Sequence, residues 1–432
     1  MWYALIDAQR RLTRAIAERL PDECAHQPVP QTPWVTPAEG ASAFRDWLLR
    51  STCSCVTAPP FAIDEVWSSG SRITVAESVV ETLPVGTLRK FTRNTIAREP
   101  AAKWPVMLCA PLAGHHAVML RETVETLLEE RDVFITDWAD ARDVPREAGP
   151  LSLDDYVLAL ERFIGAARAQ GTPVHVLAVC QATVPALAAT ALLASVQPTP
   201  FSSVSLLGGP IDTRLSPTLV DRFANSHTLT WFRNNVIAAV PPTYRGAGRR
   251  VYPGFIQQAA IIAAHPERHL SLESTYWSNW LTGDVPGAMK ALRALNEHAA
   301  VLDMAECYFL DIIHVVFHEH LLPRKMWSVA GRLVPTDALY QTPLCTIEGD
   351  RDDIAGVGQT HCAHVLCNAS SVRADRQLTV PRCNHYDLFT GSRWREAIYP
   401  SLCDFWREVE NTALRISRRP VEGRQANRRR QA

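Results

Sequence analysis

The chain has 432 residues, of which 47% are hydrophobic and 21% are charged, and its formal net charge is −1. This composition predicts a packed globular core and excludes a disordered chain. The nearly neutral charge gives no long-range field that would attract nucleic acid. The length suits one large domain with an insertion, or two domains. Twelve tryptophans are many, and some of them could lie on an apolar binding surface.

The cysteines and the first residues bear on the cellular compartment. Eleven cysteines follow no repeating spacing and their number is odd, which argues against a disulfide framework and favours a reducing compartment. The chain reaches charged side chains after six residues and lacks the basic start and apolar core of a signal peptide. No uncharged apolar run approaches the roughly 20 residues of a membrane span. We therefore expect a soluble cytoplasmic protein without integral membrane contact.

The first part of the chain predicts helices followed by antiparallel strands. Residues 1–20 carry apolar side chains at helical spacing with arginines between them, which predicts an amphipathic helix. We interpret this helix as a packing element, with a surface anchor as the alternative. A proline-rich connector and a short helix over residues 43–49 follow. Residues 72–92 alternate in polarity and predict two antiparallel strands joined around Pro84–Gly86.

From residue 105 to residue 212, short apolar strands alternate with helices, which predicts a parallel, doubly wound sheet. This rhythm breaks over residues 214–340, which are rich in aromatic residues and long helical stretches. We call this part the inserted segment and expect it to form a cap. Strands resume at Leu344, with a helix predicted over residues 357–367 and a last helix from Arg393 to about Val409. The end of the chain carries seven arginines from Arg415 onward, and we expect a disordered tail, with binding to an anionic surface as the alternative.

The stretch from Val174 to Leu187 predicts a buried strand, a sharp turn at Cys180 and a helix. Ala178 and Ala182 flank the cysteine two residues before and after it. Small residues at these positions permit the tight turn of a nucleophile elbow. The helix dipole beyond the turn would favour the thiolate form. Taken alone, the stretch fits a buried core cysteine equally well.

A thiol nucleophile needs a base, and the base needs an acid that orients it. His385 follows the last predicted strand, and an aspartate-rich loop follows the strand that ends at Gly349. The order Cys, Asp, His along the chain is that of α/β-hydrolases. In this fold the acid commonly lies three residues after the glycine, which favours Asp352, with Asp353 as second choice and Asp350 as a further competitor. Loop solvation or helix capping is the alternative role of these carboxylates.

The oxyanion of an acyl-transfer reaction needs backbone amide donors. We expect one from Gln181, directly after the nucleophile, and another from Leu112 or Ala113 in the loop after the first core strand. Either histidine of that loop, His115 or His116, could be a rival base. We favour the histidine after the last strand.

Two further sets of residues, each built on a helical spacing and the second with His320 only nearby, could be imagined as metal ligands. They are His361, His364 and Cys367 in one set, and His314, His318 and His320 in the other. Neither set has a convincing fourth ligand, so we expect no metal and no bound cofactor. The sequence also lacks a glycine-rich phosphate loop followed by Lys-Ser/Thr, which argues against nucleotide hydrolysis.

Several motifs together resemble the intracellular poly(3-hydroxybutyrate) depolymerases, over a span from the first residues to about Val409. They are APLAGHH (110–116), TDW (136–138), VCQATVP (179–185), GGPID (208–212), GRRVYPGF (248–255), DDI (352–354) with Gly358 and Gln359, and His385-Tyr386 with Gly391 and RWRE (393–396). At position 182 the chain has alanine where the family more usually has proline. Alanine should still suit the elbow.

The resemblance implies an α/β-hydrolase fold. It implies an enzyme that hydrolyses the ester bonds of amorphous polyester granules inside the cell. It also implies a Cys-Asp-His triad, which falls on Cys180, Asp352 and His385. The expected partner is the granule surface, and the oligomeric state stays open. Polyhydroxyalkanoate synthases resemble the same family but usually carry glycine where Ala178 and Ala182 stand. A synthase-like acyltransferase is therefore the first alternative, and a non-catalytic granule-associated protein is the second.

With this assignment we expect four parts along the chain. They are N-terminal helices and antiparallel strands over residues 1–95, an α/β-hydrolase core over residues 96–213 and 341–410, a cap over residues 214–340, and an arginine-rich tail over residues 411–432.

Overall fold

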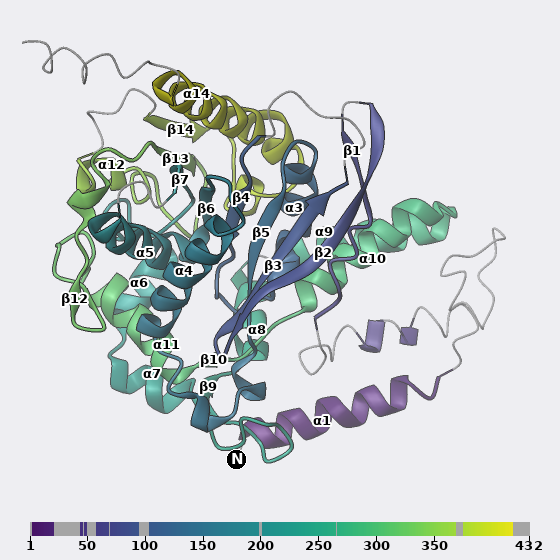
Figure 1. The fold of residues 1–432 in the computed structure, drawn as a ribbon. Helices are drawn as coiled ribbons and strands as arrows, with labels where there is room; N and C mark the ends of the chain where they lie inside the picture. The colour runs from purple at the N-terminus through teal and green to yellow at the C-terminus, as the bar shows by residue number, and fades with distance from the viewer. Residues whose placement is uncertain are drawn as a thin grey trace, which may run out of the picture.

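A computed structural model describes residues 2–20, 44–45, 47–49, 58–68, 70–94, 103–197, 201–264, 266–368 and 375–417 (Figure 1). The predicted proline-rich connector lies outside the described residues, and so does the arginine-rich tail beyond residue 417. The described residues of the short helix predicted over residues 43–49 are helical.

The centre of the molecule is a nine-stranded sheet in the order β1-β2-β3-β5-β4-β6-β7-β13-β14. The strands are β1 (Glu65–Ser68), β2 (Ser71–Leu83), β3 (Gly86–Arg93), β4 (Val106–Cys109), β5 (Val133–Trp138), β6 (His175–Val179), β7 (Ser203–Leu207), β13 (Leu344–Gly349) and β14 (Arg376–Val380). All pairs from β5 to β14 are parallel, and the pairs from β1 to β5 are antiparallel. The predicted mostly parallel α/β-hydrolase sheet and the hairpin around Pro84–Gly86 are both confirmed.

Helices cover both faces of this sheet, which is why its central strands are buried and mostly apolar. One face packs against α4 (Leu153–Arg168) and α5 (Thr183–Val196), and the other packs against α3 (Arg121–Leu128) and α14 (Tyr399–Ser417). Each face has its own cluster of buried side chains. All residues of β4, β6 and β7 are buried between the two clusters.

The sequence predicts a helix over residues 357–367, but only α12 (Ala363–Leu366) is helical. The prediction is therefore wrong for most of this range. The buried carboxylate of Glu348 explains the difference. It accepts hydrogen bonds from the backbone amides of Gly358 at 2.7 Å, Thr360 at 2.7 Å and His361 at 2.8 Å. Gly358 also has φ +93°. These contacts hold the segment as a turn in front of α12.

The inserted segment contains the helical stretches that the sequence predicts and also short strands that it does not, among them β11 (Ser328–Val329) and β12 (Arg332–Leu333), which pair with each other. The helices are α6 (Leu219–Ser226), α7 (Leu229–Asn235), α8 (Gly254–Ala264), α9 (Pro266–Thr282), α10 (Val285–Ala299) and α11 (Glu306–Ile312), the last continued by a π-helical turn over Ile313–His318. The strands β8 (Ala238–Ala239), β9 (Arg250–Tyr252) and β10 (Met304–Ala305) form a small sheet. In Figure 1, α9 and α10 lie side by side and extend away from the central sheet.

The predicted N-terminal helix is confirmed as α1 (Trp2–Ala17). Its inner side makes two polar contacts: the buried Tyr3 hydroxyl donates to the Asp303 carboxylate, and Tyr244 donates to Asp7 at 2.7 Å. Both partners belong to the inserted segment. Leu5 and Leu12 on the outer side are 71% and 63% exposed. Polar contacts and the packing of the Tyr3 ring against Phe255, at 5.4 Å between centroids, therefore hold α1 in place.

Two further observations concern the whole described part of the chain. The eight cysteines that it contains are all free. Within the same residues, no helix has both the length and the apolar character needed to cross a membrane.

Candidate active site

Cys180 lies in the turn between β6 and α5. Its backbone φ is +55°, in the left-handed region that residues with a side chain rarely adopt. The Thr183 hydroxyl donates to the Cys180 carbonyl at 2.8 Å and closes the turn. Ala178 and Ala182 are buried, whereas Cys180 is only partly buried. This strained strand-to-helix turn is the geometry of a nucleophile elbow.

His385 and Asp352 form a buried pair on the loops after β14 and β13. Nδ1 of His385 lies 2.8 Å from Oδ2 of Asp352, and the two side chains are 2% and 0% exposed. The other carboxylate oxygen of Asp352 accepts from the backbone amides of Ile354 at 2.9 Å and Ala355 at 2.8 Å. These amides fix the carboxylate, and the carboxylate fixes the ring.

The imidazole of His385 interacts with Asp352 on one side and with Cys180 on the other. Burial lowers the pKa of His385, but the negative charges of Asp352 and Cys180, with hydrogen bonds to both, raise it well above its ordinary value. Because Asp352 engages Nδ1, Nε2 is the nitrogen left for the thiol. Nε2 is buried and has no other partner in the described part of the chain. The structure thus brings together the three residues selected from the sequence.

The competing acids and bases lie elsewhere. Asp350 and Asp353 are exposed, and Asp350 accepts from the Cys383 amide at 3.1 Å. The ring of His115 lies 5.3 Å, centroid to centroid, from that of His298 in the inserted segment. Burial lowers the pKa of His116 to about 4, so this histidine is neutral at pH 7.

Gly208, directly after β7, makes room for the Asp352–His385 pair. Its φ is +54°, and a Cβ atom here would lie 2.5 Å from Leu388 Cδ1, 3.2 Å from Asp352 Oδ2 and 3.4 Å from His385 Cε1. A larger residue would therefore displace the pair. The sequence reasoning used Gly208 as part of a family motif and gave it no role, although two consecutive glycines after a buried strand are a signal of close approach.

The segments that carry the expected oxyanion donors follow two neighbouring strands of the sheet. Cys109 at the end of β4 pairs with Ala178 in β6, so the loop of Leu112 and Ala113 begins beside the elbow. The amides of Leu112 and Ala113 have no acceptor among the described residues. Gln181 lies in the first turn after the nucleophile, where amides have no partner within the turn. These amides are available to a reacting carbonyl oxygen.

Tyr308 of α11 also reaches the elbow, and the sequence reasoning did not single it out. Its hydroxyl donates to Oε1 of Gln181 at 3.3 Å, and the ring centroid lies 4.5 Å from that of Tyr156. Burial and the nearby charges of Tyr156 and Cys180 raise the pKa of Tyr308 well above its ordinary value. Tyr308 is therefore a neutral hydrogen-bond donor beside the thiol.

The two histidine sets considered as metal ligands bond to protein groups. His361 and His364 both contact the Thr346 hydroxyl, at 2.7 and 3.0 Å. His318 contacts the Ala224 carbonyl at 2.9 Å. Over the residues that the structure describes, no three His, Cys, Asp or Glu side chains are grouped to hold a metal ion.

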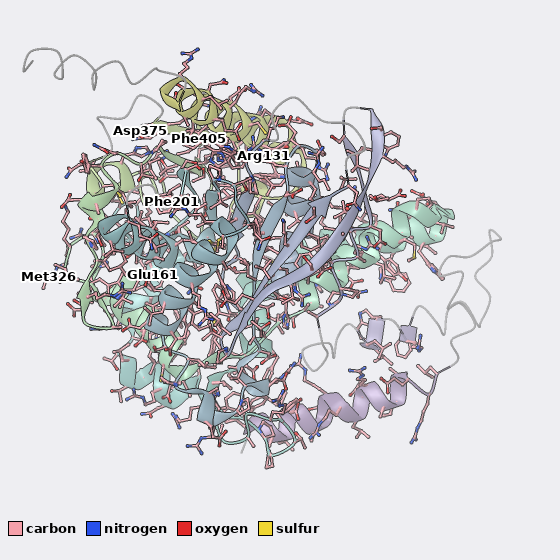
Figure 2. The ribbon with its side chains drawn as sticks, in the orientation of Figure 1. Arg131, Glu161, Phe201, Met326, Asp375 and Phe405 are labelled. Atoms are coloured by element: carbon pink, nitrogen blue, oxygen red, sulfur yellow. The ribbon has the colours of Figure 1, made fainter. Side chains whose placement is uncertain are left out.

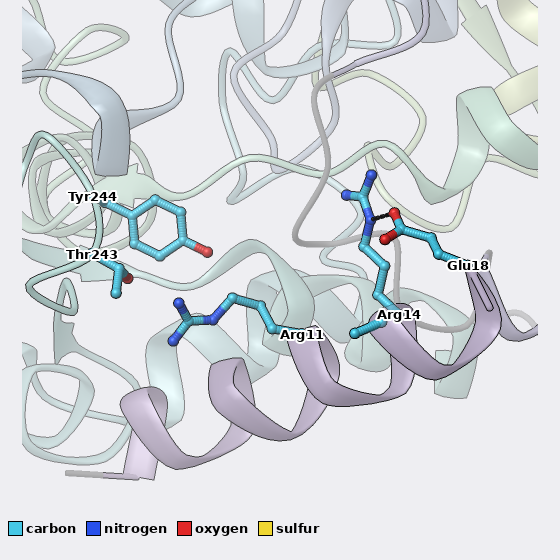
Figure 3. A pocket seen from close by; sticks show the side chains of 6 residues that line it. Arg11, Arg14, Glu18, Thr243 and Tyr244 are labelled. Carbon is cyan, nitrogen blue, oxygen red and sulfur yellow. Dashed lines mark hydrogen bonds and ion pairs between the residues drawn. The ribbon is translucent and has the colours of Figure 1, made fainter.

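A hollow of about 360 Å³ lies between α1 and the loop of Thr243 and Tyr244 (Figure 3). Arg11, Arg14 and Glu18 of α1 line it, and Arg14 and Glu18 form an ion pair at 2.7 Å. None of the residues of the Cys180 site lines this hollow, so we regard it as separate from the candidate active site.

The sheet, the cysteine elbow and the Asp–His pair on the following loops define a protein of the α/β-hydrolase class. Residues 208–410 match the family model described as PHB de-polymerase C-terminus, where PHB is poly(3-hydroxybutyrate). This part of the chain is similar to that family, and the match supports a carboxylic ester hydrolase.

Solved structures with the same fold are distant in sequence. A thermophilic esterase from Thermogutta terrifontis is 11% identical, with 80% of this chain and 98% of that chain covered and a TM-score of 0.39. A monoacylglycerol lipase from Paleococcus ferrophilus is 10% identical, with 78% and 99% covered and a TM-score of 0.40. No curated protein sequence matches the chain significantly.

Proposed function

We propose that the chain is an intracellular depolymerase that hydrolyses the ester bonds of poly(3-hydroxybutyrate)-type storage polyester at granule surfaces in the cytoplasm. It releases 3-hydroxybutyrate monomers and oligomers through Cys180, His385 and Asp352. The observation that carries the proposal is the Asp352–His385 bond beside the strained Cys180, in a chain that carries a PHB depolymerase C-terminal region.

The first half of the reaction forms a thioester. The Cys180 thiolate attacks the ester carbonyl carbon, a C–S bond forms, and the carbonyl electrons move to the oxygen. The amides of Gln181 and of the Leu112–Ala113 loop stabilise this oxyanion. Collapse of the intermediate breaks the C–O ester bond, and His385 donates its proton to the departing hydroxyl group. The acyl chain stays on sulfur.

The second half of the reaction consumes water. Neutral His385 takes a proton from a water molecule as its oxygen attacks the thioester carbonyl. The C–S bond then breaks, the thiolate leaves, and the acid product departs. Asp352 orients His385 throughout and stabilises its charged form. The raised pKa of His385 favours the charged imidazolium form, which is the proton donor of the first half of the reaction.

Native amorphous granules provide the direct test. We expect Cys180→Ala to reduce release of 3-hydroxybutyrate by at least about 10³-fold, because it removes the nucleophile and leaves only binding and oxyanion stabilisation. Cys362→Ala is the matched control, since Cys362 is also partly buried and free but bonds to the Gln359 carbonyl at 3.1 Å. Degradation that survives in Cys180→Ala would refute the assigned nucleophile.

The same preparation distinguishes the alternatives. Products released with and without CoA identify whether water or CoA accepts the acyl group. Incubation with 3-hydroxybutyryl-CoA should give no polymer growth. Growth accompanied by CoA release would favour a synthase-like acyltransferase. Granule binding without any product release from the wild type would favour a non-catalytic granule-associated protein.

A further inference from the structure

The loop that supplies the expected oxyanion donor is held by the inserted segment. The His116 amide donates to the Ala300 carbonyl at 3.1 Å, and the Leu302 amide donates to the Gly114 carbonyl at 2.8 Å. His115 and Val301 form an antiparallel bridge between these two bonds. Residues 300–302 therefore run beside the loop like a short added strand. They fix its second half, from Gly114 to His116.

One side chain reaches the first half of the loop. Nε2 of Gln257, on α8, donates a hydrogen bond to the Ala113 carbonyl. Because a peptide unit is planar, holding this carbonyl fixes the orientation of the Ala113–Gly114 peptide plane. The Ala113 amide lies in the preceding peptide plane, which is linked to this one through the φ and ψ angles of Ala113, so holding the carbonyl restricts the directions that the amide can take.

Gly114 shows how closely Gln257 approaches. Its φ is +91°, and a Cβ atom at this position would overlap the Gln257 side-chain amide. The loop thus adopts a conformation that favours glycine, with Gln257 packed against it. Oε1 of Gln257 is buried and has no partner in the described part of the chain. Gln257 therefore uses the N–H donor of its side-chain amide and leaves the buried oxygen unpaired. An unpaired buried acceptor costs free energy, and an apolar side chain at this position would not have that cost.

We propose that Gln257 is a positioning residue that holds the Leu112–Ala113 amides in the geometry needed to bind the oxyanion. The donor loop is then assembled by the inserted segment rather than by the core sheet alone. This inference rests on the proposed cysteine mechanism. It adds to that mechanism a residue outside the triad that acts only through the loop.

The test uses the full chain with the soluble ester p-nitrophenyl butyrate. Gln257→Leu removes the donor, and Gln257→Glu replaces it with an acceptor of the same shape. We expect both to lower kcat by about 10- to 100-fold with little change in KM, because small displacements of catalytic groups have effects of this size. Gln258→Ala, one residue away on α8, is the matched control and should retain wild-type kinetics.

Two reagents separate oxyanion binding from general damage. A trifluoromethyl ketone forms a tetrahedral adduct with the thiolate and needs the oxyanion donors. Its inhibition constant should rise in the Gln257 variants by the same factor as kcat falls. Iodoacetamide alkylates the thiolate without forming an oxyanion. Its rate at Cys180, followed by mass spectrometry of that peptide, should stay unchanged.

Other results of these experiments would contradict either the role of Gln257 or the cysteine mechanism. Wild-type kcat and wild-type ketone affinity in both Gln257 variants would overturn the positioning role. So would an equal loss of Cys180 alkylation, since the change would then reach the thiolate itself. Circular dichroism checks that both variants fold. If Cys180→Ala hydrolyses the ester at the wild-type rate, the proposed mechanism itself fails, whatever the Gln257 variants do.

Discussion

At the scale of single residues, the site depends on side chains that the sequence separates widely. Asp352 and His385 are 33 residues apart, yet their atoms lie 2.8 Å from each other. The sequence selects both because each follows a predicted strand, and parallel strands end at one edge of a sheet. The supporting residues Tyr308 and Gln257 could not be selected in this way. Their positions depend on how the inserted segment folds over the elbow, and no local pattern encodes that packing.

The charge of Asp352 controls the protonation of His385, and this gives a pH-dependent prediction. We expect Asp352→Asn to lower kcat by about 10³- to 10⁴-fold. Since the negative charge of Asp352 raises the pKa of His385, its removal should lower that pKa. The imidazolium would then be lost at lower pH, and the alkaline limb of the kcat/KM profile should move towards neutral pH. Stopped-flow or steady-state hydrolysis between pH 5 and 10 measures the profile.

Asp353→Asn is the control for this experiment, because Asp353 is exposed and directly follows Asp352. It should leave both the rate and the profile unchanged. A profile with the same alkaline limb in Asp352→Asn and wild type would contradict the electrostatic role of Asp352.

At the scale of elements, the docking of α14 illustrates what a sequence pattern misses. The apolar periodicity predicts an end at about Val409, whereas the helix continues to Ser417. The next residue, Glu410, pairs with Arg131 at 2.8 Å and contacts His175 at 3.3 Å. Figure 2 labels Arg131 beneath α14 and Phe405 on the helix itself. A buried polar contact thus extends an element that hydrophobic spacing alone would end.

The pH dependence of the stability of Glu410→Gln should test this contact. Burial raises the pKa of Glu410, but hydrogen bonds to His175 and Arg131 and their charges lower it from 4.5 to about 2. Because the folded-state pKa is the lower one, the stabilisation is complete above pH 4.5 and is lost as the pH falls through about 2. At pH 7 we expect Glu410→Gln to lower the free energy of unfolding by about 2–4 kcal/mol.

Urea unfolding at pH 7, 5, 4 and 3 measures the difference in the free energy of unfolding between the wild type and Glu410→Gln. This difference should shrink steadily below pH 4.5. Glu408→Gln on the same helix is the control, since its side chain is 49% exposed. A difference that stays constant over this range would rule out the charge of Glu410 as the cause.

At the scale of the whole molecule, the central sheet and its order of strands and helices follow from the sequence, but the attachment of α1 does not. Strands such as β6 are mostly apolar, and their burial between two helical layers is encoded locally. The contact between Tyr3 and Asp303 joins residues 300 positions apart. It depends on one hydroxyl and one carboxylate, which have no periodic signature. The division of the chain into four parts stays a prediction.

The Tyr3–Asp303 contact gives a prediction for the stability of the molecule. Asp303 also accepts from the Gly254 amide at 2.9 Å, and its own amide donates to Asp140 at 3.2 Å. We expect Tyr3→Phe to lower the free energy of unfolding by about 1–3 kcal/mol, because a buried carboxylate loses a donor. Thermal and urea unfolding measure the change. Leu5→Ala, on the exposed side of α1, should have little effect, and equal effects of the two substitutions would contradict the role of the hydroxyl.

The same contact has a consequence for protein synthesis. A ribosome adds about 5–20 residues per second, so the 300 residues between Tyr3 and Asp303 take about 15 to 60 s to make. For most of this interval α1 is outside the ribosome while its carboxylate partner does not yet exist. Its outer leucines and its unpaired tyrosine are then both available to chaperones. The first helix of the chain is therefore among the last to reach its final place.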